Sequence, residues 1–116
     1  MDNPSDESLI EQELEKAESA RESGNEGMAR VCARRAAGIA IGNYLQRKGY
    51  SDPGKSAYDR LRILCNLTDT PEDIRQVALY FLTKVTPDYK LPLNVDLISE
   101  ARWLINRLGQ ETDVKK

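Results

Sequence analysis

Three arginines close together in the sequence have the side chains best suited to binding chemistry. Arg30 and Arg34 are four residues apart, so on a helix they share one face, while Arg35 is displaced from Arg34 by about 100°. Guanidinium groups bind phosphate and carboxylate oxygens through paired hydrogen bonds. The cluster therefore predicts a clamp for an anion or a nucleotide.

The alternative is that these arginines are neutralised inside the protein. Four glutamates form a ridge along the preceding predicted helix: Glu11, Glu15, Glu18 and Glu22. A short turn at residues 24–25 makes the two helices antiparallel neighbours, which brings Glu18 and Glu22 near Arg30. Each exposed pair contributes only about 0–1 kcal/mol, but together they would remove the positive patch. We expect this internal pairing to form.

Two aromatic residues and one arginine lie away from the predicted apolar faces. Trp103 is on the side of its predicted helix opposite to the apolar stripe, and Tyr80 is similarly displaced on the helix before it. Such an aromatic side chain packs within the molecule, fills a protein interface or stacks on a base. We expect Tyr80, Trp103 and Arg107 to contribute to an interface with a second copy or a partner.

A loop with two prolines carries a second group of basic and aromatic residues. Lys84, Tyr89 and Lys90 mix the side-chain types that bind phosphates and bases, and loops often carry function. They extend the nucleotide- or RNA-binding alternative that starts from the three arginines. No glycine-rich phosphate-binding motif supports that alternative.

The composition argues against catalysis and against a metal site. The chain has no histidine and two cysteines, Cys32 and Cys65, which cannot supply a usual tetrahedral zinc set. The absence of histidine also removes the commonest general base. We predict no catalytic residue, no metal and no cofactor, and we interpret the cysteines as small buried hydrophobic residues.

Length and charge predict one domain of a cytoplasmic protein. The sequence has 116 residues, no apolar run long enough to cross a membrane and no signal peptide. Residues 1–26 contain nine acidic and two basic residues, whereas the remaining 90 contain ten acidic and fifteen basic residues. We expect a flexible acidic segment at 1–7, a helical domain at 8–109 and a frayed tail at 110–116.

Capping residues and apolar periodicity predict an all-α fold. The expected helices cover residues 8–23, 25–48, 56–67, 70–84 and about 95–109, with Ser8, Asn25, Thr70 and Asn94 or Asp96 as predicted caps. The second helix is apolar on nearly all sides and rich in Ala and Gly, which predicts a central position with close neighbours. We expect an up-and-down bundle of four main helices with one additional short helix.

The segments GNEGMARVCARRAAGIAIGNYLQRKG (24–49), KSAYDRLRIL (55–64) and DIRQVALYFLTKVTPDYKLPLNVDLISEARWLINRL (73–108) resemble the HEPN domain family. This family comprises small helical bundles associated with nucleotidyltransferases and with toxin–antitoxin systems. The resemblance implies a homodimer, a nucleotidyltransferase partner or nucleotide binding, with no DNA-binding motif. Active ribonucleases of the family carry an Arg-x(4–6)-His motif, and this chain has Arg75 and Tyr80 at that spacing. The resemblance therefore leaves a divergent ribonuclease as a third alternative.

Overall fold

A computed structural model describes residues 6–50, 56–83 and 95–111. These residues form five helices and no strand: α1 (Asp6–Glu22), α2 (Glu26–Arg47), α3 (Ala57–Asn66), α4 (Glu72–Leu82) and α5 (Leu97–Gln110). The predicted all-α class is confirmed. Most of the predicted terminal segments, and the proline-containing turn and loop, lie outside the described residues.

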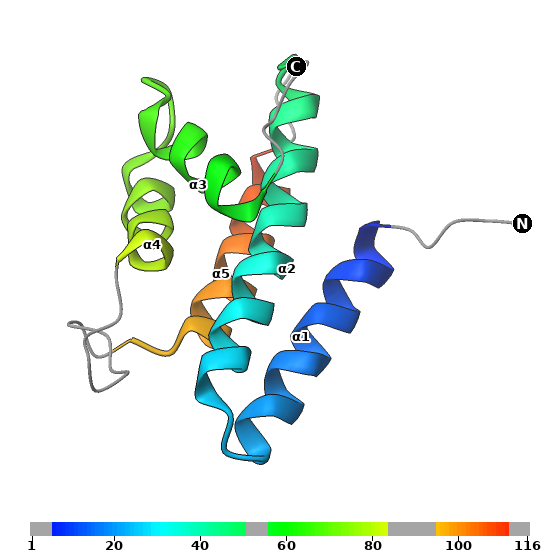
Figure 1. Cartoon of the computed structure of the whole chain (residues 1–116). Coiled ribbons are helices and arrows are strands. Elements are labelled where there is room, and N and C mark those ends of the chain that lie inside the picture. Colours follow the sequence, from blue (N-terminus) through cyan, green and yellow to red (C-terminus); the bar gives the residue numbers. More distant parts are fainter. Residues whose placement is uncertain (1–5, 51–55, 84–94, 112–116) are drawn as a thin grey trace, which may run out of the picture.

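The second helix occupies the centre of the arrangement, as its apolar circumference predicts. It packs against α1 on one side, α5 behind it and α3, which crosses it (Figure 1). Helix α4 packs against α3 and α5, and the long helices α1, α2, α4 and α5 run in alternating directions (Figure 1). The buried side chains of all five helices form one core.

Side chains cap the starts of three of the five helices, and two of these caps, Asn25 and Asp96, are the predicted ones. The side chains of Asn25, Ser56 and Asp96 accept hydrogen bonds from backbone N–H groups in the first turns of α2, α3 and α5. Gly24 and Gly49, at φ of +86° and +96°, take the left-handed conformation that ends α1 and α2.

Two predicted caps are wrong. Helix α1 begins at Asp6, so Ser8 lies inside it rather than at its start. The hydroxyl of Thr70 donates to the Leu64 carbonyl at 2.8 Å, and Pro71 takes the capping position of α4. Thr70 therefore joins the end of α3 to the start of α4, because the last carbonyls of α3 also need hydrogen-bond donors.

The glycines of α2 allow α3 to cross at close range. A Cβ atom on Gly38 would lie 2.6 Å from the Ala57 Cβ and 2.8 Å from the Ala57 Cα. One turn later, a Cβ on Gly42 would lie 2.5 Å from a nitrogen of the Arg60 guanidinium, which donates to the Gly38 carbonyl at 3.0 Å. The predicted close packing at this glycine pair is confirmed.

Candidate functional site

The three arginines of α2 do not form one clamp. Arg30 is buried, Arg34 is half-buried and Arg35 is exposed. Arg35 borders a hollow of about 240 Å³ between α1, α2 and α3, together with Glu13 of α1 and Arg60 of α3. The helical rotation of about 100° between neighbouring residues separates Arg35 from the other two, as the sequence predicted.

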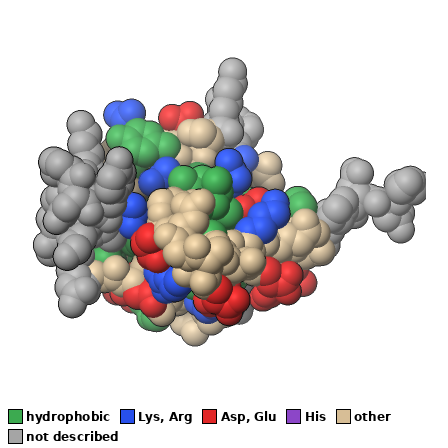
Figure 2. All heavy atoms as spheres, turned by 60° about the horizontal axis from the view of Figure 1, so that its bottom comes forward, with side chains coloured by type: hydrophobic (Ala, Val, Ile, Leu, Met, Phe, Trp, Pro, Cys, Tyr) green, Lys and Arg blue, Asp and Glu red, His purple; other side chains and the backbone are tan. Residues whose placement is uncertain are grey.

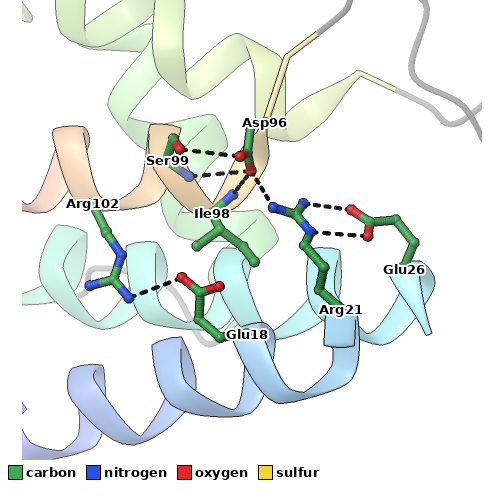
Figure 3. A network of polar contacts seen from close by, with 7 residues as sticks. All are labelled: Glu18, Arg21, Glu26, Asp96, Ile98, Ser99 and Arg102. Carbon is green, nitrogen blue, oxygen red and sulfur yellow. Dashed lines mark hydrogen bonds and ion pairs between the residues drawn. The ribbon is translucent and has the colours of Figure 1, made fainter. Parts of the chain in front are cut away.

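The expected pairing between the acidic ridge and these arginines is wrong. Glu18 instead pairs with Arg102 of α5, with 3.3 Å between the charged atoms. Arg21 of α1 donates to Glu26 through two nitrogens at 3.1 and 2.6 Å, and to Asp96 at 2.9 Å (Figure 3). The acidic helix is therefore tied to α5 and to the start of α2, one turn before Arg30.

This network shifts the protonation of its carboxyl groups. The Arg21 hydrogen bonds hold the pKa of Glu26 below its usual value, and the charge of Arg30 contributes more weakly in the same direction. Burial opposes ionisation of Asp96, but hydrogen bonds from Arg21 and Ser99 lower its pKa overall. Both carboxylates already have strong partners.

Arg30 and Arg34 remain without an ion pair or a hydrogen bond to any described residue. Only 8% of the Arg30 surface is exposed. The Nε atom of Arg34 is shielded from solvent and has no hydrogen-bond partner within the described part of the chain. Burying a cation without hydrogen bonds opposes folding, so these two side chains require an explanation.

Most other arginines have a clear structural role. Within the described ranges, six donate hydrogen bonds: Arg21, Arg47, Arg60, Arg75, Arg102 and Arg107. The Arg62 guanidinium lies over the Tyr58 ring, 5.9 Å from its centre. Arg30, which is buried, and Arg34, which is half-buried, differ from these because neither donates a hydrogen bond to a described residue.

The predicted interface residues gather where α4 and α5 meet. Arg107 donates to Asp73 of α4 at 2.9 Å and to Glu111 at 2.6 Å, so its guanidinium is already occupied. On their helices, Trp103 lies about 40° from Arg107 and Tyr80 about 20° from Asp73. Each aromatic residue is therefore on roughly the same side of its helix as one member of this pair, and we call the contact between the two helices the α4–α5 seam.

The seam is held by a charged pair and bordered by exposed apolar surface. The Arg107 hydrogen bond is the main reason that the pKa of Asp73 lies below its usual value. Trp103 is 38% exposed, Tyr80 is half-buried, and Leu79 on the outer side of α4 is 43% exposed. The prediction that Trp103 lies off the core is confirmed, whereas the same prediction for Tyr80 is wrong because Tyr80 packs, partly buried, against the core. A partner for either residue stays a prediction.

Arg75, the arginine of the ribonuclease alternative, makes structural hydrogen bonds that the sequence did not predict. Its Nε donates to the Cys65 carbonyl at 3.0 Å, one terminal nitrogen to the Leu67 carbonyl at 2.7 Å, and the other to Glu72 at 2.9 Å. The guanidinium thus satisfies carbonyls at the end of α3, which have no partner within the helix.

The cysteines fit the expected structural role. Cys32 is buried and Cys65 is half-buried. Burial raises the pKa of both thiols; Glu13 adds to the effect at Cys32, while Arg75 opposes it at Cys65. A protonated thiol is a poor nucleophile and a poor metal ligand, so neither cysteine has the properties of a reactive residue.

Sequence reasoning missed Glu13 and Arg60, which line the hollow beside Arg35. Glu13 is three residues after Ile10 and four before Ala17, so its spacing already placed it beside the buried stripe of α1. The predicted loop residues Lys84, Tyr89 and Lys90 lie outside the described residues. No group of three His, Cys, Asp or Glu side chains suited to a metal ion occurs within the described ranges.

Comparisons with protein-family models, curated proteins and solved structures find no match to this chain. The HEPN resemblance therefore stays a prediction. Among the described helices, none combines the length and the apolar character needed to cross a membrane.

Proposed function

We propose that this chain is a non-catalytic helical module that acts through homodimerisation and a protein partner. The α4–α5 seam is the proposed contact surface, and the exposed Trp103 is the observation that carries the proposal. Tryptophan and tyrosine are enriched among the residues that dominate binding energy at protein interfaces. The Asp73–Arg107 pair supports the proposal because it joins the two helices that present the aromatic side chains.

The proposed partner is a nucleotidyltransferase, as the HEPN resemblance implies, and the proposed architecture is the four-helix bundle of that family. The central, alanine-rich α2 and the alternating directions of the long helices are compatible with it (Figure 1). The Arg75 guanidinium already makes three hydrogen bonds, of which the one to Glu72 is also an ion pair. No described contact therefore favours the ribonuclease alternative.

Sedimentation velocity tests the homodimer. We expect the wild-type chain to dimerise with rising concentration and Trp103→Ala to weaken this association at least about tenfold, the loss typical of one central interface residue. Tyr50→Ala is the matched control, because Tyr50 is also 38% exposed but lies beyond the end of α2. A wild-type monomer at high concentration, or equal effects of both variants, contradicts the proposal.

A second candidate function is anion binding by α2. It is favoured by the burial of Arg30 and by the shielded Nε of Arg34, which has no partner among the described residues. The first proposal leaves these charges unexplained, whereas a bound anion would compensate them. We expect the wild-type chain to bind nucleotides or short RNA at low salt, with affinity reduced by Arg34→Gln. No detectable binding of any anion at low salt would contradict this candidate.

A further inference from the structure

Arg30 and Arg34 lie close enough together to bind the same small anion. They are one helical turn apart on the same face of α2, where such residues have Cβ atoms about 5–6 Å apart. Arg35 is directed to the hollow beside Glu13 and Arg60 instead. A ligand of Arg30 and Arg34 therefore meets two guanidinium groups, not three.

The nearest carboxylate in the sequence compensates Arg30 only weakly. Glu26 is one turn before Arg30, and two nitrogens of Arg21 already bind both of its oxygens. Glu18, which we expected to pair with Arg30, is bound to Arg102. No described carboxylate therefore forms an ion pair with Arg30 or Arg34.

The number of charges and acceptor atoms favours one class of ligand. A phosphate monoester carries a charge of about −1.5 to −2 at neutral pH and three strong acceptor oxygens, whereas a carboxylate carries −1 and two oxygens. Arg30 and Arg34 together carry two positive charges, which the former matches more closely. We infer that Arg30 and Arg34 bind a compact phosphate monoester, an inference that rests on the second candidate function above.

The surroundings disfavour a nucleic-acid backbone. Long polyanions bind to exposed, continuous positive surfaces, but Arg30 is 8% exposed. Around the end of the molecule where α1 joins α2, blue and red side chains are interleaved without forming a uniform positive patch (Figure 2). The acidic α1, which borders α2 along its length, would further repel a polyanion.

Titration calorimetry and thermal melting of the full chain with inorganic phosphate test this inference. We expect saturable phosphate binding that raises the melting temperature, while acetate at equal ionic strength has a much smaller effect. Arg34→Gln should reduce phosphate affinity at least about tenfold, and Arg34→Lys by less, because lysine keeps the charge without the planar fork. Arg35→Gln is the matched control and should leave affinity unchanged.

Arg30→Met gives an independent readout that does not need the ligand. Methionine keeps most of the apolar stem and removes the buried charge, so the free variant should melt at a higher temperature than the wild type and lose its response to phosphate. Equal effects of acetate and phosphate, or of Arg35→Gln and Arg34→Gln, would overturn the inference.

Two further outcomes separate this inference from the function on which it rests. Short RNA that binds through Arg34 more tightly than phosphate, with a steep salt dependence, overturns the phosphate-monoester assignment and leaves anion binding intact. If the chain binds neither phosphate nor RNA and Arg30→Met destabilises it, both the phosphate-monoester inference and the anion-binding function are overturned.

Discussion

The arginines of this chain divide by what their guanidinium groups contact. Arg75 and Arg107 donate to carbonyls or carboxylates of neighbouring helices, whereas Arg30 is buried and Arg34 is half-buried without a hydrogen bond to a described residue. Burying a cation with hydrogen bonds supports the fold, but burying it without them opposes folding. Arg75 and Arg107 therefore stabilise the fold. Arg30 and Arg34 should lower the stability of the free protein in exchange for binding an anion.

Arg75→Met tests the stabilising class. The variant loses two hydrogen bonds to the Cys65 and Leu67 carbonyls, so we expect the free energy of unfolding to fall by about 2–3 kcal/mol. Urea denaturation followed by circular dichroism measures the change. Arg62→Met is the matched control on exposed α3 surface and should stay within about 0.5 kcal/mol of wild type. Equal losses would show that Arg75 does not anchor the end of α3.

Side-chain partners were harder to predict than side-chain directions. Helical rotation alone placed Trp103 off the core and separated Arg35 from Arg34, because direction depends on spacing along one helix. The partner of Glu18 depends on a third helix instead. It is Arg102, 84 positions later, and the hairpin of α1 and α2 carries no information about where α5 lies.

At the scale of helices, the contact between α2 and α3 depends on one missing side chain. Gly38 faces the backbone of Ala57, so any Cβ at this position must push α3 away. Gly42 faces the flexible end of Arg60, which can move aside. The sequence predicted close packing at these glycines, but it did not predict that a short crossing helix would be the neighbour.

Gly38→Ala should therefore destabilise the protein although alanine favours helices. Overpacking against α3 costs about 1–3 kcal/mol, and the gain of about 1 kcal/mol in helix propensity offsets only part of it. Gly27→Ala is the matched control in the same helix, where the new Cβ meets only the Asn25 Oδ1 at 3.8 Å. We expect Gly27→Ala to be neutral or stabilising in urea denaturation. Two stabilised variants would contradict the close approach of α3.

Helix ends were predictable where a single side chain decides them. Asn25 and Asp96 cap their helices as expected, and Ser56 caps α3 in the same way, because each needs only the N–H groups of the following turn. Thr70 was mispredicted because its hydroxyl bonds to the end of α3. A capping rule that considers only the following turn fails at Thr70, because a carbonyl at the end of the preceding helix accepts its hydroxyl instead.

At the scale of the whole molecule, charge pairing joins helices that are distant in the sequence. Arg21 connects α1 with the starts of α2 and α5 (Figure 3), and Arg107 connects α5 with α4. The carboxylates in these pairs, Glu26, Asp96 and Asp73, have lowered pKa values. Since the chain has no histidine, its stability should respond to acid through these carboxylates rather than near neutral pH.

The pH dependence of unfolding tests this network. A carboxyl group with a lowered folded pKa stabilises the protein above its unfolded pKa, about 3.9–4.3, and this contribution disappears as pH falls through the folded pKa. We therefore expect a nearly constant free energy of unfolding from about pH 5.5 to 8 and a decline below about pH 4. Chemical denaturation across this range measures it, and a decline already near pH 6 would contradict it.

Asp73→Asn should lower the free energy of unfolding between about pH 5.5 and 8 and should make its decline in acid smaller. The variant loses at most about 1 kcal/mol at neutral pH, because the pair with Arg107 is partly exposed to solvent. Its curve should then approach the wild-type curve as the pH falls, since protonation removes the same interaction from the wild type. Glu15→Gln, at an exposed position of α1, should run parallel to the wild type throughout. If the Asp73→Asn curve also stays parallel, this carboxylate does not couple α4 to α5, and the α4–α5 seam is held by apolar packing alone.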